Sequence, residues 1–297
     1  MCSDKDLNTL IVRVNGELHK LCNWFIANKI SVNASKCKYI IFHNRGKIIP
    51  PNLADVVLNL NPFETNPNSD LITPLERVCK SNPNAQFYKY LGLLIDEHLN
   101  YNLHVDYICK KLNRSLFCLN RVKHVLNGGA LRTLYFSLFQ SHLLYCNIIF
   151  NCCNLTNINR ILKLQKKAIR TITNSNYNAH TQPLFLKLNI LPFDKMLTLN
   201  RSVFIHSIYH KNHHISFLNT WILNQQRETE HTLRNQNLFQ LPFPRTEQFK
   251  KSPLYFLPKS WNDLPNELKC QENPFTFKIA LKNHLYRQLE AEDPTVA

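Results

Sequence analysis

The chain has 297 residues, of which 44% are hydrophobic and 11% aromatic, so it has enough apolar sequence for a large core and is not an intrinsically disordered protein. It carries 36 Lys and Arg residues against 20 Asp and Glu residues, a formal net charge of +16. We therefore expect an anionic partner, of which nucleic acid is the commonest large one, although a basic surface kept only for solubility is the alternative. Only 5 glycines argue against a Gly-rich nucleotide loop, and the Leu-rich composition favours helices.

The cellular setting is predicted from the cysteines and from the first residues. Ten cysteines are scattered along the chain, and no two of them have the C-x-x-C spacing of a zinc ribbon. The first six residues are polar, unlike a signal peptide. The most apolar stretch, 134–150, is interrupted by polar residues and is short for a membrane span. We expect a reduced intracellular protein without a membrane partner, in either the nucleus or the cytoplasm.

The first hundred residues are expected to mix one helix with short strands. Apolar residues at helical spacing predict a helix over 5–28, with Ser3 and Asp6 forming its capped start. Alternation and β-branched residues predict strands over 36–43 and 55–60. A further strand is expected over 86–96, with Gly92 in its middle to allow a bulge or a close backbone approach.

Beyond residue 102 the apolar period becomes helical. Helices are expected over 103–126, 130–150, 157–173 and 194–211, with a turn at 127–129 between the first two. The signal weakens over 215–268, and a last helix is expected from Pro274 to Leu289 with Asn273 as its N-cap. The pattern predicts a mostly helical α+β protein in three parts, residues 1–100, 101–212 and 213–297.

Positive charge is concentrated in the predicted helical part. Between Glu97 and Asp194 the only acidic residue is Asp106. Because a solvated helix face normally carries interspersed acidic partners, their absence favours contact with the phosphates of a nucleic-acid duplex, although a simple solvated face is the alternative. The candidate nucleic-acid-binding residues are Lys110, Lys111 and Arg114 on one helix and Arg160, Lys163, Lys166, Lys167 and Arg170 on another.

The residues give weak support for catalysis or for metal binding. His206, His210, His213 and His214 share one side of a helix, but no carboxylate or cysteine follows them, so a structural role is favoured and no metal site is predicted. Two-metal nucleotidyl transfer needs clustered carboxylates, whereas the aspartates here are isolated. No Walker loop or nucleophile elbow is present.

Several stretches of the sequence follow recognisable patterns. The segment 21–42 fits the pattern L-x-x-W-x-x-x-N-x-L-x-L-N-x-x-K-T-x-x-x-x-F, with a cysteine in place of the threonine, and residues 90–96 fit the pattern Y-L-G-hydrophobic-x-hydrophobic-D. Together these stretches resemble the reverse transcriptases of non-LTR (LINE-type) retrotransposons, in particular the jockey-like elements. Further similarity lies at 134–138, 144–145, 165–170, 258–265 and 275–285, in the family's order.

The resemblance implies a fold and roles for particular residues. It implies a truncated palm remnant (1–100), a helical thumb (101–212) and a C-terminal extension (213–297) of an RNA-directed DNA polymerase. Lys36 matches the family's motif-D lysine, and Tyr90, Leu91 and Gly92 match its primer grip. Intact members use Mg²⁺, held by an Asp pair that we expect to lie before this chain, so the chain alone is expected to hold no cofactor and to be inactive.

The expected function is therefore non-specific binding of template–primer nucleic acid, an RNA–DNA hybrid or a DNA duplex. A segment carrying the missing fingers and palm, or an intact polymerase, is a further expected partner. Two alternatives remain open: a helical protein-interaction module, and a non-functional remnant of a decayed element.

Overall fold

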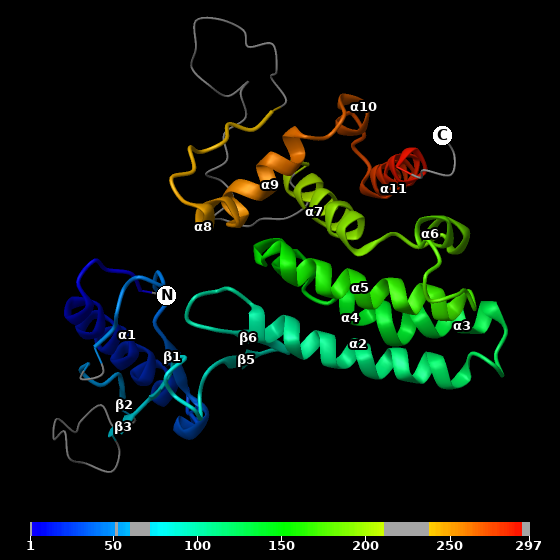
Figure 1. The fold of residues 1–297 in the computed structure, drawn as a ribbon. Coiled ribbons are helices and arrows are strands. Elements are labelled where there is room, and N and C mark those ends of the chain that lie inside the picture. The colour runs from blue at the N-terminus through cyan, green and yellow to red at the C-terminus, as the bar shows by residue number, and fades with distance from the viewer. Residues whose placement is uncertain (1, 51–52, 60–71, 211–237, 293–297) are drawn as a thin grey trace, which may run out of the picture. The chain divides into compact units, whose positions relative to one another are not determined.

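The computed structural model describes residues 2–50, 53–59, 72–210 and 238–292, and it divides into two compact units, residues 1–103 and 104–297 (Figure 1). The chain is mostly helical with a few short strands, which confirms the expected α+β, mostly helical class. The sequence placed one domain boundary at 100/101; the other, at 212/213, lies outside the described residues.

The first unit opens with helix α1 (Leu7–Ala27). Its N-cap is Asp6, whose carboxylate accepts a hydrogen bond from the Thr9 N–H at 2.7 Å. The expected capped start formed by Ser3 with Asp6 was wrong as to Ser3, because the Asp6 carboxylate itself provides the acceptor for the free N–H groups. Asn15 holds α1 to the next segment: its amide donates to the Asp55 carbonyl at 3.0 Å and accepts from the Val57 N–H at 3.1 Å.

Within the described part of this unit, six three-residue strands form three separate pairs. The parallel pair is β1 (Lys38–Ile40) with β4 (Glu76–Val78), and a short 3-10 turn (Ala34–Lys36) precedes β1. The antiparallel pairs are β2 (Val57–Asn59) with β3 (Ile72–Pro74), and β5 (Tyr88–Tyr90) with β6 (Leu93–Ile95). The expected strand over 86–96 was therefore wrong: Leu91 (φ 47°) and Gly92 (φ 91°) reverse the chain as the two central residues of a tight hairpin turn.

The second unit is helical. Helix α2 begins at the end of the first unit, and the described elements after it follow in chain order: α2 (Asn102–Val122), α3 (Gly128–Leu134), a π-helical turn (Tyr135–Gln140), α4 (Ser141–Leu144), a 3-10 helix (Asn147–Cys152), α5 (Leu155–Ile172), α6 (Gln182–Leu188), α7 (Phe193–Tyr209), α8 (Glu247–Lys250), α9 (Pro253–Asn262), α10 (Asn266–Lys269) and α11 (Pro274–Ala291).

The single helix expected over 130–150 was also wrong, because the backbone changes its winding there. Leu131, Tyr135, Phe139 and Leu143 are all buried at a spacing of four. In a straight α-helix four-residue steps drift around the axis by about 40°, and the wider π turn over residues 135–140 offsets that drift, so that all four side chains reach one core. The helical run ends at Leu144, and Cys146, whose φ of 50° is left-handed, precedes the 3-10 helix that follows.

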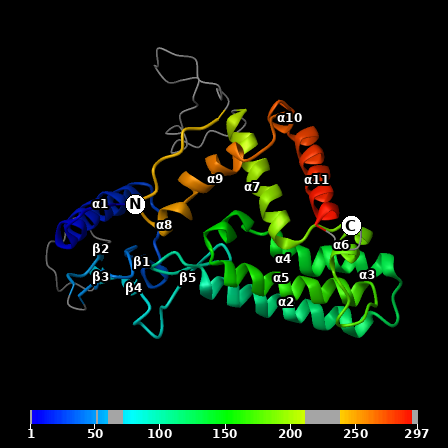
Figure 2. The same cartoon turned by 45° about the horizontal axis from the view of Figure 1, so that its top comes forward.

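Helix α7 is the centre of the second unit, because it packs against α5, α9 and α11 (Figure 2). Its start is fixed by Gln165, a fully buried residue of α5. The Gln165 amide nitrogen donates to the Tyr135 hydroxyl at 2.9 Å and to the Leu191 carbonyl at 3.0 Å, while its oxygen accepts from the Phe193 N–H at 2.7 Å. One side chain therefore joins the π turn, α5 and the start of α7.

None of the helices within the described residues is both long enough and apolar enough to span a membrane.

Replacing Gln165 with leucine tests how much the second unit depends on this amide. We expect Gln165→Leu to lower the free energy of unfolding by about 3 kcal/mol, because it leaves the Tyr135 hydroxyl and two backbone groups buried without their partner. Urea unfolding followed by circular dichroism measures the change. Asn159→Ala, an exposed change on the same helix, is the control, and an equal effect of both substitutions would contradict the expectation.

Candidate nucleic-acid interface

Helices α2 and α5 lie side by side and run in the same direction (Figure 2). Near their first turns the Arg160 guanidinium is 2.6 Å from the Asp106 carboxylate. Near their last turns the Thr171 hydroxyl donates to the Asn120 side chain at 3.2 Å. Because these contacts join early residue to early residue and late to late, the helices are parallel, and their solvent faces border one another.

The face of α2 opposite its core carries cations and an aromatic ring. Lys110, Arg114, Phe117 and Arg121 follow one another at intervals of four, three and four residues, so they share one side of the helix. All four are exposed, and Phe117 keeps 62% of its surface accessible. The Arg121 guanidinium lies 5.3 Å from the centre of the Phe117 ring, a cation–π contact that holds both side chains against the surface.

Lys111, also predicted as a nucleic-acid contact, lies on a different side of α2. It is half-buried, and its ammonium is 4.7 Å from the centre of the Tyr107 ring. The three cations predicted on α2 are therefore not equivalent, because Lys110 and Arg114 face solvent together whereas Lys111 covers an aromatic side chain.

The five cations predicted on α5 divide in the same way. Lys163 and Lys167 are exposed. Arg160 is paired with Asp106, Arg170 donates from Nε to the Ala179 carbonyl at 2.9 Å, and Lys166 is half-buried beside a cavity of about 230 Å³ that is also lined by Asp194 and Glu292. Three of the five thus take part in contacts within the second unit or line its cavity, and two are free to meet a ligand.

The electrostatics of this surface follow from its lack of acids. From residue 98 to residue 193 the chain has twelve Lys and Arg residues and one acid, Asp106, which is committed to Arg160. Among the residues that the structure describes, no carboxylate pairs with Lys110, Arg114, Arg121, Lys163 or Lys167. We name these five residues and Phe117 the basic face.

The other residues singled out from the sequence lie in the first unit. Tyr90 and Leu91 are exposed at the tip of the β5–β6 hairpin, with Gly92 completing the turn. A leucine at φ 47° is strained, and such strain persists where the surrounding structure imposes it. Lys36 is exposed at the end of the short turn before β1, and it forms no ion pair with any described residue.

Of the four histidines that the sequence places on one side of a helix, the structure describes His206 and His210. His206 is fully buried, its Nε2 donates to the Gln271 carbonyl at 2.6 Å, and its ring stacks on Phe277 with 4.1 Å between centroids. The His210 ring lies 4.4 Å from that of His206. These contacts support the structural role expected for the cluster, while His213 and His214 lie outside the described residues.

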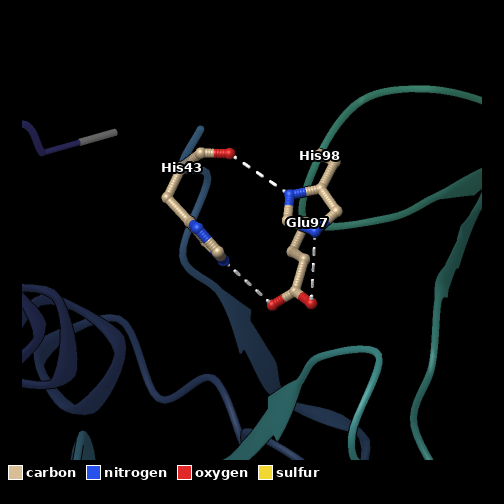
Figure 3. Close-up of side chains that lie close together, drawn as sticks. All are labelled: His43, Glu97 and His98. Atoms are coloured by element: carbon tan, nitrogen blue, oxygen red, sulfur yellow. Dashed lines mark hydrogen bonds and ion pairs between the residues drawn. The ribbon is translucent and has the colours of Figure 1, made fainter. Parts of the chain in front are cut away.

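A second histidine cluster was not predicted from the sequence. His43, in the loop after β1, meets Glu97 and His98, in the loop after β6 (Figure 3). Burial by itself would raise the pKa of Glu97, but a hydrogen bond from the Lys80 N–H and the nearby His43 and His98 outweigh it and lower that pKa. Because 54 residues separate His43 from Glu97, no compact motif marks the cluster in the sequence.

Comparison with known proteins gives no match: no family model, no curated protein and no solved structure is similar to this chain.

The burial of His206 predicts a dependence of stability on pH. Burial is the main cause that lowers its pKa from the ordinary value of 6.5, so below that pH the unfolded chain binds the proton more readily than the folded one. The free energy of unfolding should therefore fall as pH is lowered from about 7 to 5.5, with one histidine contributing at most about 1.4 kcal/mol per pH unit. His206→Gln should flatten that slope in urea unfolding.

The slope should flatten without vanishing, because burial also lowers the pKa of His104, His142 and His210. His124→Gln, at an exposed position, is the control and should leave the slope unchanged. A slope in His206→Gln that equals that of the unmodified protein would contradict the expectation.

Proposed function

We propose that this chain binds nucleic-acid duplex without sequence preference through the basic face of α2 and α5. We further propose that it is the C-terminal portion of an RNA-directed DNA polymerase of the non-LTR retrotransposon type, one that lacks the catalytic Asp pair and is inactive by itself.

The observation that carries the first proposal is the set of exposed cations without acidic partners on two adjacent parallel helices. Lys110 and Arg121 are eleven residues apart, so they span about 16 Å along α2, which is roughly five base-pair steps of a duplex. Contacts of Lys and Arg with phosphates fix register and orientation without reading sequence. The exposed ring of Phe117 between these cations offers an apolar surface for a sugar or a base.

A solvated helix face is the competing explanation for this surface, and the lack of acids along α2 and α5 argues against it. Lys20, Lys250 and Lys259 each have a carboxylate within 4 Å, three or four residues away on the same helix or at its end, whereas other exposed cations, such as Arg13 and Lys278, form no ion pair with a described residue. On α2 and α5 such partners are missing at all five cations of the basic face. Mutual repulsion of these cations is relieved when an anion binds.

The polymerase proposal rests on the sequence resemblance, and three features of the first unit are consistent with it. The Tyr90–Gly92 segment forms a tight hairpin turn with an exposed tip, as a primer grip would require. Lys36 is exposed next to the parallel β1–β4 pair, where a motif-D lysine would need to reach a nucleotide.

The third feature is the incompletely covered apolar side of α1. Leu21 and Trp24 belong to the apolar stripe of this helix, yet they keep 44% and 54% of their surface exposed, while Cys22 beside them is buried. Under the proposal, this side contacts the polymerase segment that carries the catalytic pair and the Mg²⁺ ions. It is also the feature that a helical protein-interaction module would use.

A salt titration of binding tests the nucleic-acid proposal. The full chain should bind a short RNA–DNA hybrid at low salt, with an affinity that falls steeply as salt rises, because bound phosphates release counterions. Lys110→Ala/Arg114→Ala/Arg121→Ala should weaken binding and reduce the slope of log K against log[salt] by about 0.9 for each phosphate that the variant no longer neutralises. Lys163→Ala/Lys167→Ala should act in the same direction.

The matched control removes three positive charges from residues that already have acidic partners, Lys20→Ala/Lys250→Ala/Lys259→Ala. It should keep the salt slope close to that of the unmodified chain. If the control and the α2 variant weaken binding equally, net charge and not the basic face determines binding, which contradicts the proposal. If the chain does not bind the hybrid at low salt, the proposal is rejected, and the interaction module or the decayed remnant is favoured.

A further inference from the structure

The cluster of His43, Glu97 and His98 has no role in the proposed function, and its hydrogen bonds define the state of each ring. The His43 Nδ1 is 2.9 Å from the Asn44 carbonyl, and the His98 Nδ1 is 3.3 Å from the His43 carbonyl. A carbonyl oxygen only accepts hydrogen bonds, so both Nδ1 atoms must carry the hydrogen. In the neutral ring each Nε2 then has a free lone pair.

Both of these Nε2 lone pairs point toward the same carboxylate (Figure 3). The His43 Nε2 lies 3.3 Å from one Glu97 oxygen, and the His98 Nε2 lies 3.9 Å from the other. Three donor atoms from two loops therefore lie close together, in the kind of arrangement that a metal ion with imidazole and carboxylate ligands uses.

The three side chains are largely buried. The side chains of His43, Glu97 and His98 are only 10%, 9% and 19% exposed. The Arg77 guanidinium lies 3.7 Å from the same carboxylate. A metal ion bound between the three donor atoms would form bonds to all of them.

The distances fit a zinc-type ion after a small contraction. Tetrahedral Zn²⁺ with bonds of about 2.0–2.1 Å keeps its ligand atoms about 3.3 Å apart. The three donor atoms lie within 4.8 Å of one another, and the contact between His43 and Glu97 is already 3.3 Å. Binding would therefore require the more distant donor atoms to move together by up to about 1.5 Å.

The surroundings of the three side chains are those of supported metal ligands. Both rings donate Nδ1–H to backbone carbonyls, the contact that fixes the tautomer of metal-binding histidines. The Lys80 N–H donates to Glu97 at 2.9 Å and orients its carboxylate. A cavity of about 480 Å³ adjoins the cluster and has room for a water molecule; Arg45, Lys80, Asp96 and Asn100 line it together with Glu97 and His98.

We propose that His43 Nε2, His98 Nε2 and the Glu97 carboxylate bind one divalent cation of the zinc class, with a water molecule from the adjoining cavity as its fourth ligand. Two imidazoles and one carboxylate suit Zn²⁺ or Co²⁺ and disfavour Ca²⁺ and Mg²⁺, which prefer oxygen ligands. The ion ties the loop after β1 to the loop after β6. The proposal does not depend on nucleic-acid binding.

Zinc binding to the full chain, measured by equilibrium dialysis at neutral pH, tests the proposal. The unmodified protein should bind one equivalent of Zn²⁺ more than Glu97→Gln or His98→Gln at the same free concentration. The affinity of the site should fall at least about a hundredfold in each variant, because even removal of a residue that only supports a ligand costs 10–100-fold. The control His19→Gln/His124→Gln removes two exposed histidines and should bind as the unmodified protein does.

Two further measurements keep the proposal testable if a ligand variant fails to fold. Arg77→Met keeps all three ligands and removes the nearby positive charge, so it should bind Zn²⁺ more tightly than the unmodified protein. In the unmodified protein, nitrogen NMR should show Zn²⁺ shifting the Nε2 resonances of two histidines while their Nδ1 atoms stay protonated. Equal zinc binding by all variants, or a Co²⁺ spectrum dominated by thiolate charge transfer, would overturn the proposal.

Discussion

The buried amide of Gln165 is the interaction on which the second unit depends. An amide has both donors and an acceptor, so this one side chain satisfies a tyrosine hydroxyl, a carbonyl and an N–H that otherwise lie buried at the meeting point of the π turn, α5 and α7. The hydroxyl of Tyr135 is neutral here, because burial raises its pKa well above the ordinary value. A charged residue at position 165 would need an opposite charge in the core, whereas the amide completes the network without one.

Because the core of the second unit is neutral, it needs no charged partner from the surface. Asp106 is the only acid between residues 98 and 193 and its carboxylate pairs with Arg160, so no acid of this stretch remains to pair with the cations of the basic face. Short polar contacts join α2 and α5 near both of their ends, and the apolar sides of the two helices are buried, so the unit tolerates a strongly positive exterior. The folding of this unit therefore does not depend on ion pairs made by the basic face. Its cations can contact phosphates without giving up contacts that stabilise the fold.

The sequence predicted the elements that have a long periodic pattern of apolar residues. It failed where the backbone conformation of a single residue ends or reverses an element. The helices over 103–126, 157–173 and 194–211 were found within a few residues because their apolar periodicity is long. The break near Cys146 was missed, because cysteine rarely adopts the left-handed φ found there, so no residue type signalled it. The residue pattern missed the reversal at Leu91, although the family resemblance implied a hairpin there, because leucine rarely adopts positive φ and no residue type signalled a turn before Gly92.

For the candidate nucleic-acid interface, the sequence predicted which stretches of chain carry the cations. It did not predict which of these side chains form hydrogen bonds or ion pairs within the protein. Nothing in the sequence pattern distinguishes Lys163, which is exposed, from Arg170, which donates to the Ala179 carbonyl, since both lie on the basic side of one helix. The cluster of His43, Glu97 and His98 depends on two loops 54 residues apart meeting beyond short strands. Exposed lysines without partners cost a protein little stability, so a basic face can persist without a ligand. The small cluster gathers three largely buried polar side chains from two loops, which costs more to maintain, and it is therefore the stronger indication of a selected ligand.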